Sequence, residues 1–213
     1  MATTLFTNGH VTAEQVRALA HDAKHLEVVK SCTSEVDPMV VTDRNGGKHS
    51  FLCYGLKNEG LNKYHKYLLE THEELLKGYE DVEMFKLAYG FGAVLMPASD
   101  EEGCESTKLI YNRDFIENFI KEVKGEDDED YMGRIVRGMC HGAVISNMTN
   151  ESGWMDTVKL SRTDGSKYAE TCMAQWEEMK SDDKVDTELL NEYIQWLVVN
   201  HIPMFTQMFM ATA

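Results

Sequence analysis

Residues 39–54, Met39-Val-Val-Thr-Asp-Arg-Asn-Gly-Gly-Lys-His-Ser-Phe-Leu-Cys-Tyr54, interrupt an otherwise helical sequence and read as a β-hairpin. Pro38 breaks the chain directly before them. Asn45-Gly46 supplies the positive-φ turn that a two-residue hairpin loop requires. The stretch therefore predicts one small hairpin near residues 39–54.

Helical patterns dominate on both sides of this hairpin. Thr12 and Gln15 form a capping-box signature, and the apolar face that follows predicts a helix over roughly 13–31. Apolar residues at helical spacing predict five more helices, over about 61–78, 82–96, 115–125, 131–144 and 168–179.

The last helix has the strongest start signal in the chain. Asp186 is a suitable N-cap, and Val185 and Leu190 have the spacing of a hydrophobic staple. Pro203 interrupts the helical pattern at about Ile202.

Together these patterns predict a mainly α fold. We expect one helical, bundle-like domain over residues 1–213, with about seven helices and the one hairpin. Gly125 to Asp130 is the best candidate for a hinge between subdomains, because a glycine there ends one helical pattern before an acidic run.

The chain carries a formal net charge of −15, which is unevenly distributed. Residues 1–100 contribute −4 and residues 101–213 contribute −11. No basic cluster is left to neutralise phosphates, so direct nucleic-acid binding is not expected. The acidity favours solubility and would equally favour a basic protein partner.

The cysteines and the N-terminus indicate a cytoplasmic protein. Five cysteines occur without a CxxC pair, which suits reduced thiols better than a disulfide framework or a zinc site. The N-terminus does not resemble a signal peptide, and the longest nearly apolar run is about half a membrane span.

Two histidine pairs are candidates for a metal site. His21 and His25 have the spacing of a zinc-binding HExxH helix, with Asp22 in place of its glutamate. His65 and His72 lie seven residues apart beside several glutamates, but Leu69 stands where a Glu-x-x-His pair needs its acid. We favour a solvated helix surface for the first pair and an exposed polar stripe for the second, and we expect no metal or cofactor.

An acidic patch follows Gly125. It consists of Glu126, Asp127, Asp128, Glu129 and Asp130. Acids at this position suit the N-terminus of the helix that follows. A calcium loop is rejected, because Met139 would occupy the position that needs a bidentate glutamate.

The C-terminal stretch Pro203-Met-Phe-Thr-Gln-Met-Phe-Met-Ala-Thr-Ala213 is uncharged and apolar, whereas chain ends are usually polar. Five of its residues are candidates for an interaction surface: Met204, Phe205, Met208, Phe209 and Met210. The segment must be buried within its own subunit or against a neighbour, and the sequence does not choose between these.

These features favour a non-enzymatic assembly or structural protein that self-associates through its C-terminal segment. A component of a viral or phage particle would fit this description. One alternative is an acidic regulator that mimics nucleic acid and inhibits a basic partner. A second is a metal-dependent enzyme that uses the helix histidines.

Overall fold

A computed structural model describes residues 18–19, 22–42, 46–77, 79–95, 107–125, 129–148 and 185–211 of the chain. Within these ranges only the backbone is described for residues 34, 93–95, 129, 145–148 and 202–211. The predicted helix over 168–179, the capping box at Thr12 and most of the acidic patch lie outside the described residues.

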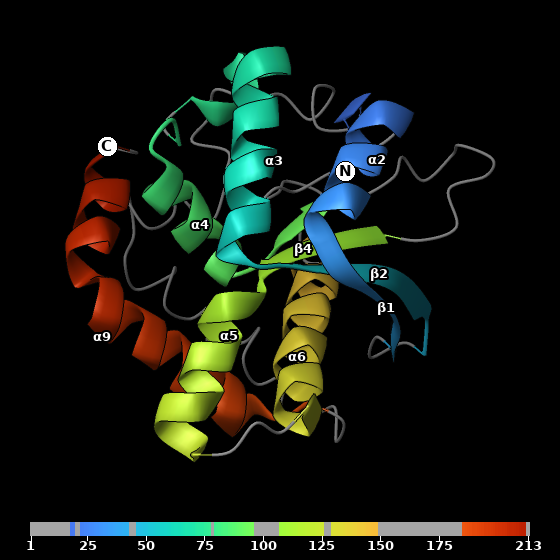
Figure 1. The fold of residues 1–213 in the computed structure, drawn as a ribbon. Helices are drawn as coiled ribbons and strands as arrows, with labels where there is room; N and C mark the ends of the chain where they lie inside the picture. The colour runs from blue at the N-terminus through green and yellow to red at the C-terminus, as the bar shows by residue number, and fades with distance from the viewer. Residues whose placement is uncertain are drawn as a thin grey trace.

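A four-stranded mixed sheet lies at the centre of the molecule (Figure 1). Its strand order is β1-β2-β4-β3. The strands are β1 (Thr33–Thr42), β2 (Lys48–Leu56), β3 (Ala93–Leu95) and β4 (Thr107–Asn112). β1 and β2 form the antiparallel hairpin, β4 runs parallel to β2, and β3 is antiparallel to β4.

Helices cover both faces of this sheet. Figure 1 shows one group above it: α2 (Ala23–Cys32), α3 (Asn58–Thr71) and α4 (Val82–Gly90), with a 3₁₀ turn at Glu73–Leu76. The second group lies below: α5 (Arg113–Phe119), α6 (Glu129–Met148) and α9 (Thr187–Ala211), with a π-helical turn η2 (Ile120–Lys124) extending α5.

The two layers of core follow from the alternation of side chains along β2 and β4. Phe51, Cys53 and Leu109 belong to the cluster formed with α5, α6 and α9. Tyr54 and Ile110 belong to the cluster formed with α2, α3 and α4. Successive strand residues point to opposite faces, so both faces of a central strand are apolar when helices cover both.

The prediction of a helical bundle was therefore wrong. The chain is mostly helical, but its helices pack on a sheet, and the predicted hairpin is longer than 39–54 and forms half of that sheet. The sequence Thr107-Lys-Leu-Ile-Tyr-Asn112, for which we predicted neither a helix nor a strand, forms the strand that pairs with β2. Six α-helices lie within the described residues, against about seven expected for the whole chain.

Two helix boundaries also differ from expectation. The helix predicted over 82–96 ends at Gly90, because Gly92 takes a φ of 80° and the chain turns into β3. The helix predicted over 13–31 contains a break, since Asp22 is extended and caps a helix that begins at Ala23.

The later helices were predicted well. η2 ends at Gly125, which has a φ of 78°, and α6 covers the predicted range 131–144. Asp186 accepts a hydrogen bond from the backbone N–H of Leu189 at 3.0 Å, as an N-cap should. None of the helices in the described part of the chain is long and apolar enough to cross a bilayer.

Candidate functional site

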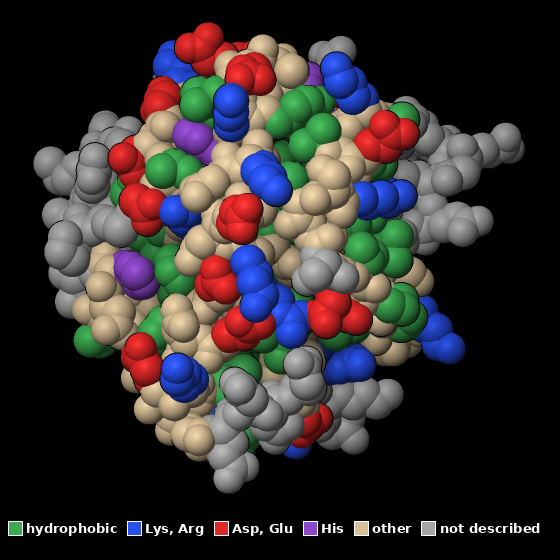
Figure 2. All heavy atoms as spheres, in the orientation of Figure 1, with side chains coloured by type: hydrophobic (Ala, Val, Ile, Leu, Met, Phe, Trp, Pro, Cys, Tyr) green, Lys and Arg blue, Asp and Glu red, His purple; other side chains and the backbone are tan. Residues whose placement is uncertain are grey.

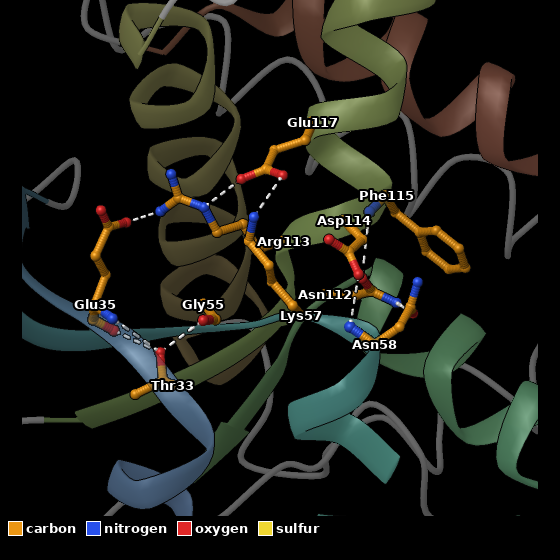
Figure 3. Close-up of polar contacts among 10 residues, drawn as sticks. All are labelled: Thr33, Glu35, Gly55, Lys57, Asn58, Asn112, Arg113, Asp114, Phe115 and Glu117. Carbon is orange, nitrogen blue, oxygen red and sulfur yellow. Dashed lines mark hydrogen bonds and ion pairs between the residues drawn. The ribbon is translucent and has the colours of Figure 1, made fainter.

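Polar side chains collect where β2 and β4 end side by side. Leu56 and Asn112 are paired across these parallel strands, and each strand leads directly into a helix, α3 or α5. The carboxyl ends of parallel strands are where α/β proteins usually place their polar sites. We call this group the strand-end network; its members are Glu35, Lys57, Asn58, Asn112, Arg113, Asp114 and Glu117 (Figure 3).

Asn112 holds three helices together at this edge. It is fully buried, and its side-chain oxygen accepts a hydrogen bond from the N–H of Phe115 at 3.2 Å, which caps α5. Its Nδ2 donates to Asn58 Oδ1 and to the carbonyl of Lys86, both at 3.3 Å. The amide thus connects α5 with the first residue of α3 and with α4.

Arg113 and Glu117 form the charged centre of the network. Arg113 Nε donates to Glu117 Oε1 at 2.6 Å, and the Arg113 guanidinium also pairs with Glu35 of β1. Lys57 Nζ donates to Glu117 Oε2 at 3.2 Å. The Glu117 carboxylate therefore pairs with two cations, and the Arg113 guanidinium joins β1 to α5.

These contacts set the ionisation of Glu117. Burial alone would raise the pKa of its carboxyl, but the hydrogen bonds and charges of Arg113 and Lys57 outweigh burial and lower that pKa. The hydrogen bond and charge of Glu117 raise the pKa of Lys57 in turn. The Glu117 carboxylate and the Lys57 ammonium, each stabilised by the other, are therefore both charged at neutral pH.

Asp114 caps a helix other than its own. The N-cap of α3 is Lys57, whose side chain makes no capping hydrogen bond. Instead Asp114 Oδ2 accepts from the backbone N–H of Asn58 at 2.7 Å (Figure 3). A carboxylate at a helix N-terminus is stabilised by the exposed N–H groups there. The position in which an anionic ligand would bind α3 is thus filled by the chain itself.

The strand-end network is consequently a structural clamp. Glu35 and Glu117 pair with its two cations, Asp114 accepts from a backbone N–H, and its amides bond to one another and to backbone. Thr33 extends the clamp by donating to the carbonyl of Gly55 at 2.6 Å. This arrangement fixes β1, β2, α3 and α5 relative to each other and commits its charged groups to internal partners.

The structure places His25 in the core, contrary to the expected solvated surface. Its side chain is fully buried, and Nε2 lies 2.8 Å from the Tyr64 hydroxyl. Burial is the largest influence on the imidazole and lowers its pKa to about 4, although Asp22 opposes the shift. α2 begins after Asp22, so the HExxH-like spacing does not lie on one continuous helix. His21 is outside the described residues.

The second histidine pair is not an exposed stripe either. His65 is 5% exposed, and its Nε2 lies 3.1 Å from the carbonyl of Tyr79. His72 is half-buried, with Nε2 3.7 Å from Asp22 Oδ2. The two histidines contact different residues. In the described parts of the chain, no three His, Cys, Asp or Glu side chains gather in a way that could hold a metal ion.

The other candidate residues are only partly described. Asp130 pairs with Arg134 on α6, and Glu129 begins that helix, whereas Glu126, Asp127 and Asp128 lie outside the described residues. Five apolar candidates, of which only the backbone is described, lie in the last turns of α9: Met204, Phe205, Met208, Phe209 and Met210.

Sequence reasoning missed the strand-end network altogether. The available signal was Asn112-Arg-Asp-Phe115, a good N-cap after a short apolar run, which marks a strand-to-helix junction. No local signal predicted that this junction would contact Lys57 and Glu35, because the contact depends on which strands become neighbours.

No family model matches this chain. Likewise, no curated protein and no solved structure shows significant similarity to it. The functional argument therefore depends on the geometry of the described residues.

Proposed function

We propose that this chain is a non-enzymatic assembly protein that self-associates through the C-terminal part of α9. One observation carries the proposal: α9 exposes Val198 and Val199, by 37% and 67%, about one helical turn before the uncharged apolar segment that begins at Pro203. Exposed apolar side chains that continue into an apolar segment favour contact with another protein surface.

The first part of α9 supplies a rigid base for this surface. Tyr193 and Leu197 are fully buried, and the Tyr193 hydroxyl donates to the carbonyl of Gly90 at 2.6 Å. Trp196 Nε1 donates to Glu122 Oε2 at 2.9 Å. A neighbour that bound to α9 would thus bind to a helix already held by its own subunit, so little ordering entropy would be lost.

A kink separates this base from the end of the helix. His201 has non-helical angles, φ −124° and ψ 21°, two residues before Pro203. Proline has no N–H to donate to the carbonyl four residues earlier, which belongs to Val199, and its ring crowds that carbonyl. Beyond the kink α9 continues along the side of the molecule on which α4 lies (Figure 1).

The charge distribution on the face drawn in Figure 2 argues against binding that is driven mainly by electrostatics. Figure 2 shows acidic and basic side chains interspersed there, with no large area of one sign. An interface built on α9 would be apolar and therefore resistant to salt, whereas an acidic regulator would lose its basic partner as salt is added.

The test is the oligomeric mass of Val199→Lys and of a chain that ends at Pro203, measured by light scattering over a range of concentrations. Burying a lysine in place of valine should weaken self-association on the order of 10- to 100-fold. Val123→Lys is the matched control, because Val123 is likewise an exposed valine, by 47%, but lies on η2 and not on α9.

We expect the wild type and Val123→Lys to form the same oligomer, and the two α9 variants to form folded monomers. A wild-type chain that stays monomeric at high concentration would refute the proposal. So would an oligomer that both α9 variants retain. Binding to a basic protein that disappears with added salt would favour the acidic regulator instead.

A further inference from the structure

Two buried thiols from distant parts of the sequence meet in the core. Cys53 of β2 and Cys140 of α6 are both fully buried, and their Sγ atoms are 3.6 Å apart although 87 residues separate them. The sequence predicted reduced thiols and no disulfide framework. The close contact between these two sulfurs was not foreseen.

The two sulfurs are in contact but are not bonded. A disulfide places its sulfurs about 2.05 Å apart, so the pair would have to close by about 1.6 Å. Formation of the bond therefore requires the two side chains, one on β2 and one on α6, to move toward each other. Cys32 provides a contrast, because it is half-buried and its nearest recorded polar partner is the hydroxyl of Ser31 at 3.9 Å.

We propose that Cys53 and Cys140 form a redox latch, which becomes a disulfide joining β2 to α6 when a peroxide reaches the pair. One thiol attacks the peroxide and becomes a sulfenic acid, with release of one water from hydrogen peroxide. The second thiol then attacks that sulfur, forming the S–S bond and releasing a second water. Peroxide accepts the two electrons that the thiols lose.

The surroundings of the pair make this reaction conditional on opening of the core. The hydrogen bond with Cys53, together with burial, raises the pKa of the Cys140 thiol, so little thiolate exists while α6 is packed on the sheet. Opening exposes the sulfurs to water and peroxide. The second step is then fast, because the partner sulfur is already adjacent.

The disulfide would join β2 to α6 and would close a ring of chain between two residues that are 87 positions apart. Cross-links that close long loops restrict the unfolded chain most. We therefore expect the oxidised protein to melt about 5–10 °C above the reduced protein, with dithiothreitol reversing the shift.

The experiment treats the full-length native chain with hydrogen peroxide, blocks the remaining thiols, and maps peptides by mass spectrometry without reduction. We expect a linked pair of peptides containing Cys53 and Cys140, lighter by two hydrogen atoms than the sum of the reduced peptides. Cys140→Ala should abolish both the link and the rise in melting temperature, and Cys32→Ala should abolish neither.

Because the wild-type peptide map needs no variant, a misfolded Cys140→Ala chain would not affect the conclusion. The proposal is overturned if both thiols remain free for labelling after Cys32 has been oxidised. It is also overturned if the link forms only in urea-unfolded protein.

Discussion

Two polar regions of this molecule, one partly exposed and one fully buried, affect their ionisable groups in opposite ways. The strand-end network keeps Glu117 charged, because Arg113 and Lys57 hydrogen-bond to it. The pocket between α2 and α3 keeps His25 neutral, because the imidazole is fully buried against Tyr64 and lacks a strong counter-charge. Pairing preserves charge in the first region and desolvation removes it in the second, so the two regions respond to acid over different pH ranges.

The largest loss of stability is expected when Arg113, whose guanidinium lies at the charged centre of the network, is replaced. Arg113→Met removes the partner of both Glu35 and Glu117 at a side chain that is 9% exposed. It should lower the unfolding free energy by about 3 kcal/mol, the low end for breaking a buried pair, because Glu117 keeps Lys57. Urea denaturation at pH 7 measures this loss.

Arg134→Met is the matched control for that experiment. Arg134 is 46% exposed and pairs with Asp130 on the surface of α6. Exposed ion pairs contribute little, so the control should change stability much less. Equal losses in the two variants would show that the network is not a clamp.

The second-largest effect is expected from acid, which should lower the stability of the folded protein through His25. The imidazole has an ordinary pKa of 6.5, lowered to about 4 in the folded protein. Below pH 6.5 the unfolded chain gains a proton that the folded chain refuses, so stability falls as the pH drops from 6.5 toward 4. The loss at pH 5 should be about 2 kcal/mol.

Denaturation curves at pH 7.5 and 5 for the wild type and His25→Gln test this expectation. Glutamine can still hydrogen-bond to Tyr64 but does not titrate. The variant should therefore lose less stability than the wild type between the two pH values. His49→Gln, a change at a half-buried histidine near the hairpin turn, serves as the control and should behave like the wild type. An unchanged pH dependence in His25→Gln would remove the contrast between the two regions.

A smaller effect is expected at the amide that connects three helices. Asn112→Ala removes the N-cap of α5 and the two hydrogen bonds from Nδ2, to Asn58 and Lys86. The cost should be about 1.5 kcal/mol. Asn112→Ser keeps an oxygen at the cap position and loses both hydrogen bonds from Nδ2, so its stability measured by thermal unfolding should lie between those of alanine and the wild type. A serine variant no better than alanine would indicate that the cap contributes little.

The smallest effect is expected for Glu117→Gln, which should cost about 1 kcal/mol at pH 7. The folded pKa of Glu117 lies below the ordinary value of 4.5, so its contribution is present above pH 4.5 and is lost as the pH falls through the folded pKa. Wild type and variant should therefore converge in stability at strongly acidic pH. A difference that persists there would mean that shape, and not charge, fixes Glu117.

Local signals predicted much of the secondary structure. The cap at Asp186 and the stop at Gly125 depend on neighbours within a few residues, and the described structure agrees with their positions. The hairpin was also predicted, but the described register pairs Thr42 with Lys48 and so does not fit the two-residue loop expected at Asn45-Gly46. The strand at Thr107–Asn112 escaped prediction because six residues, apolar on both faces, carry no clear period of two. That strand turned an expected bundle into helices on a sheet.

The candidate site was less predictable than the fold. His25 and His65 were expected at the surface, since short motifs say nothing about which helix face another helix will cover. Their burial depends on the packing of α2, α3 and α4 on the sheet. The strand-end network combines three stretches of the chain, at Glu35, at 57–58 and at 112–117, which span 82 positions, so only the pairing of β2 with its neighbouring strands assembles it.

The sequence by itself determined the existence of the hairpin and the ends of some helices, such as the start at Asp186 and the stop at Gly125, because caps, turns and periodicity act over a few residues. It also determined that residues 203–213 form an uncharged apolar segment. The tertiary structure alone decided that β2 pairs with β4, that His25 is buried and neutral, and that Cys53 lies against Cys140. These outcomes depend on contacts between distant residues, whose energies exist only once the layers have packed.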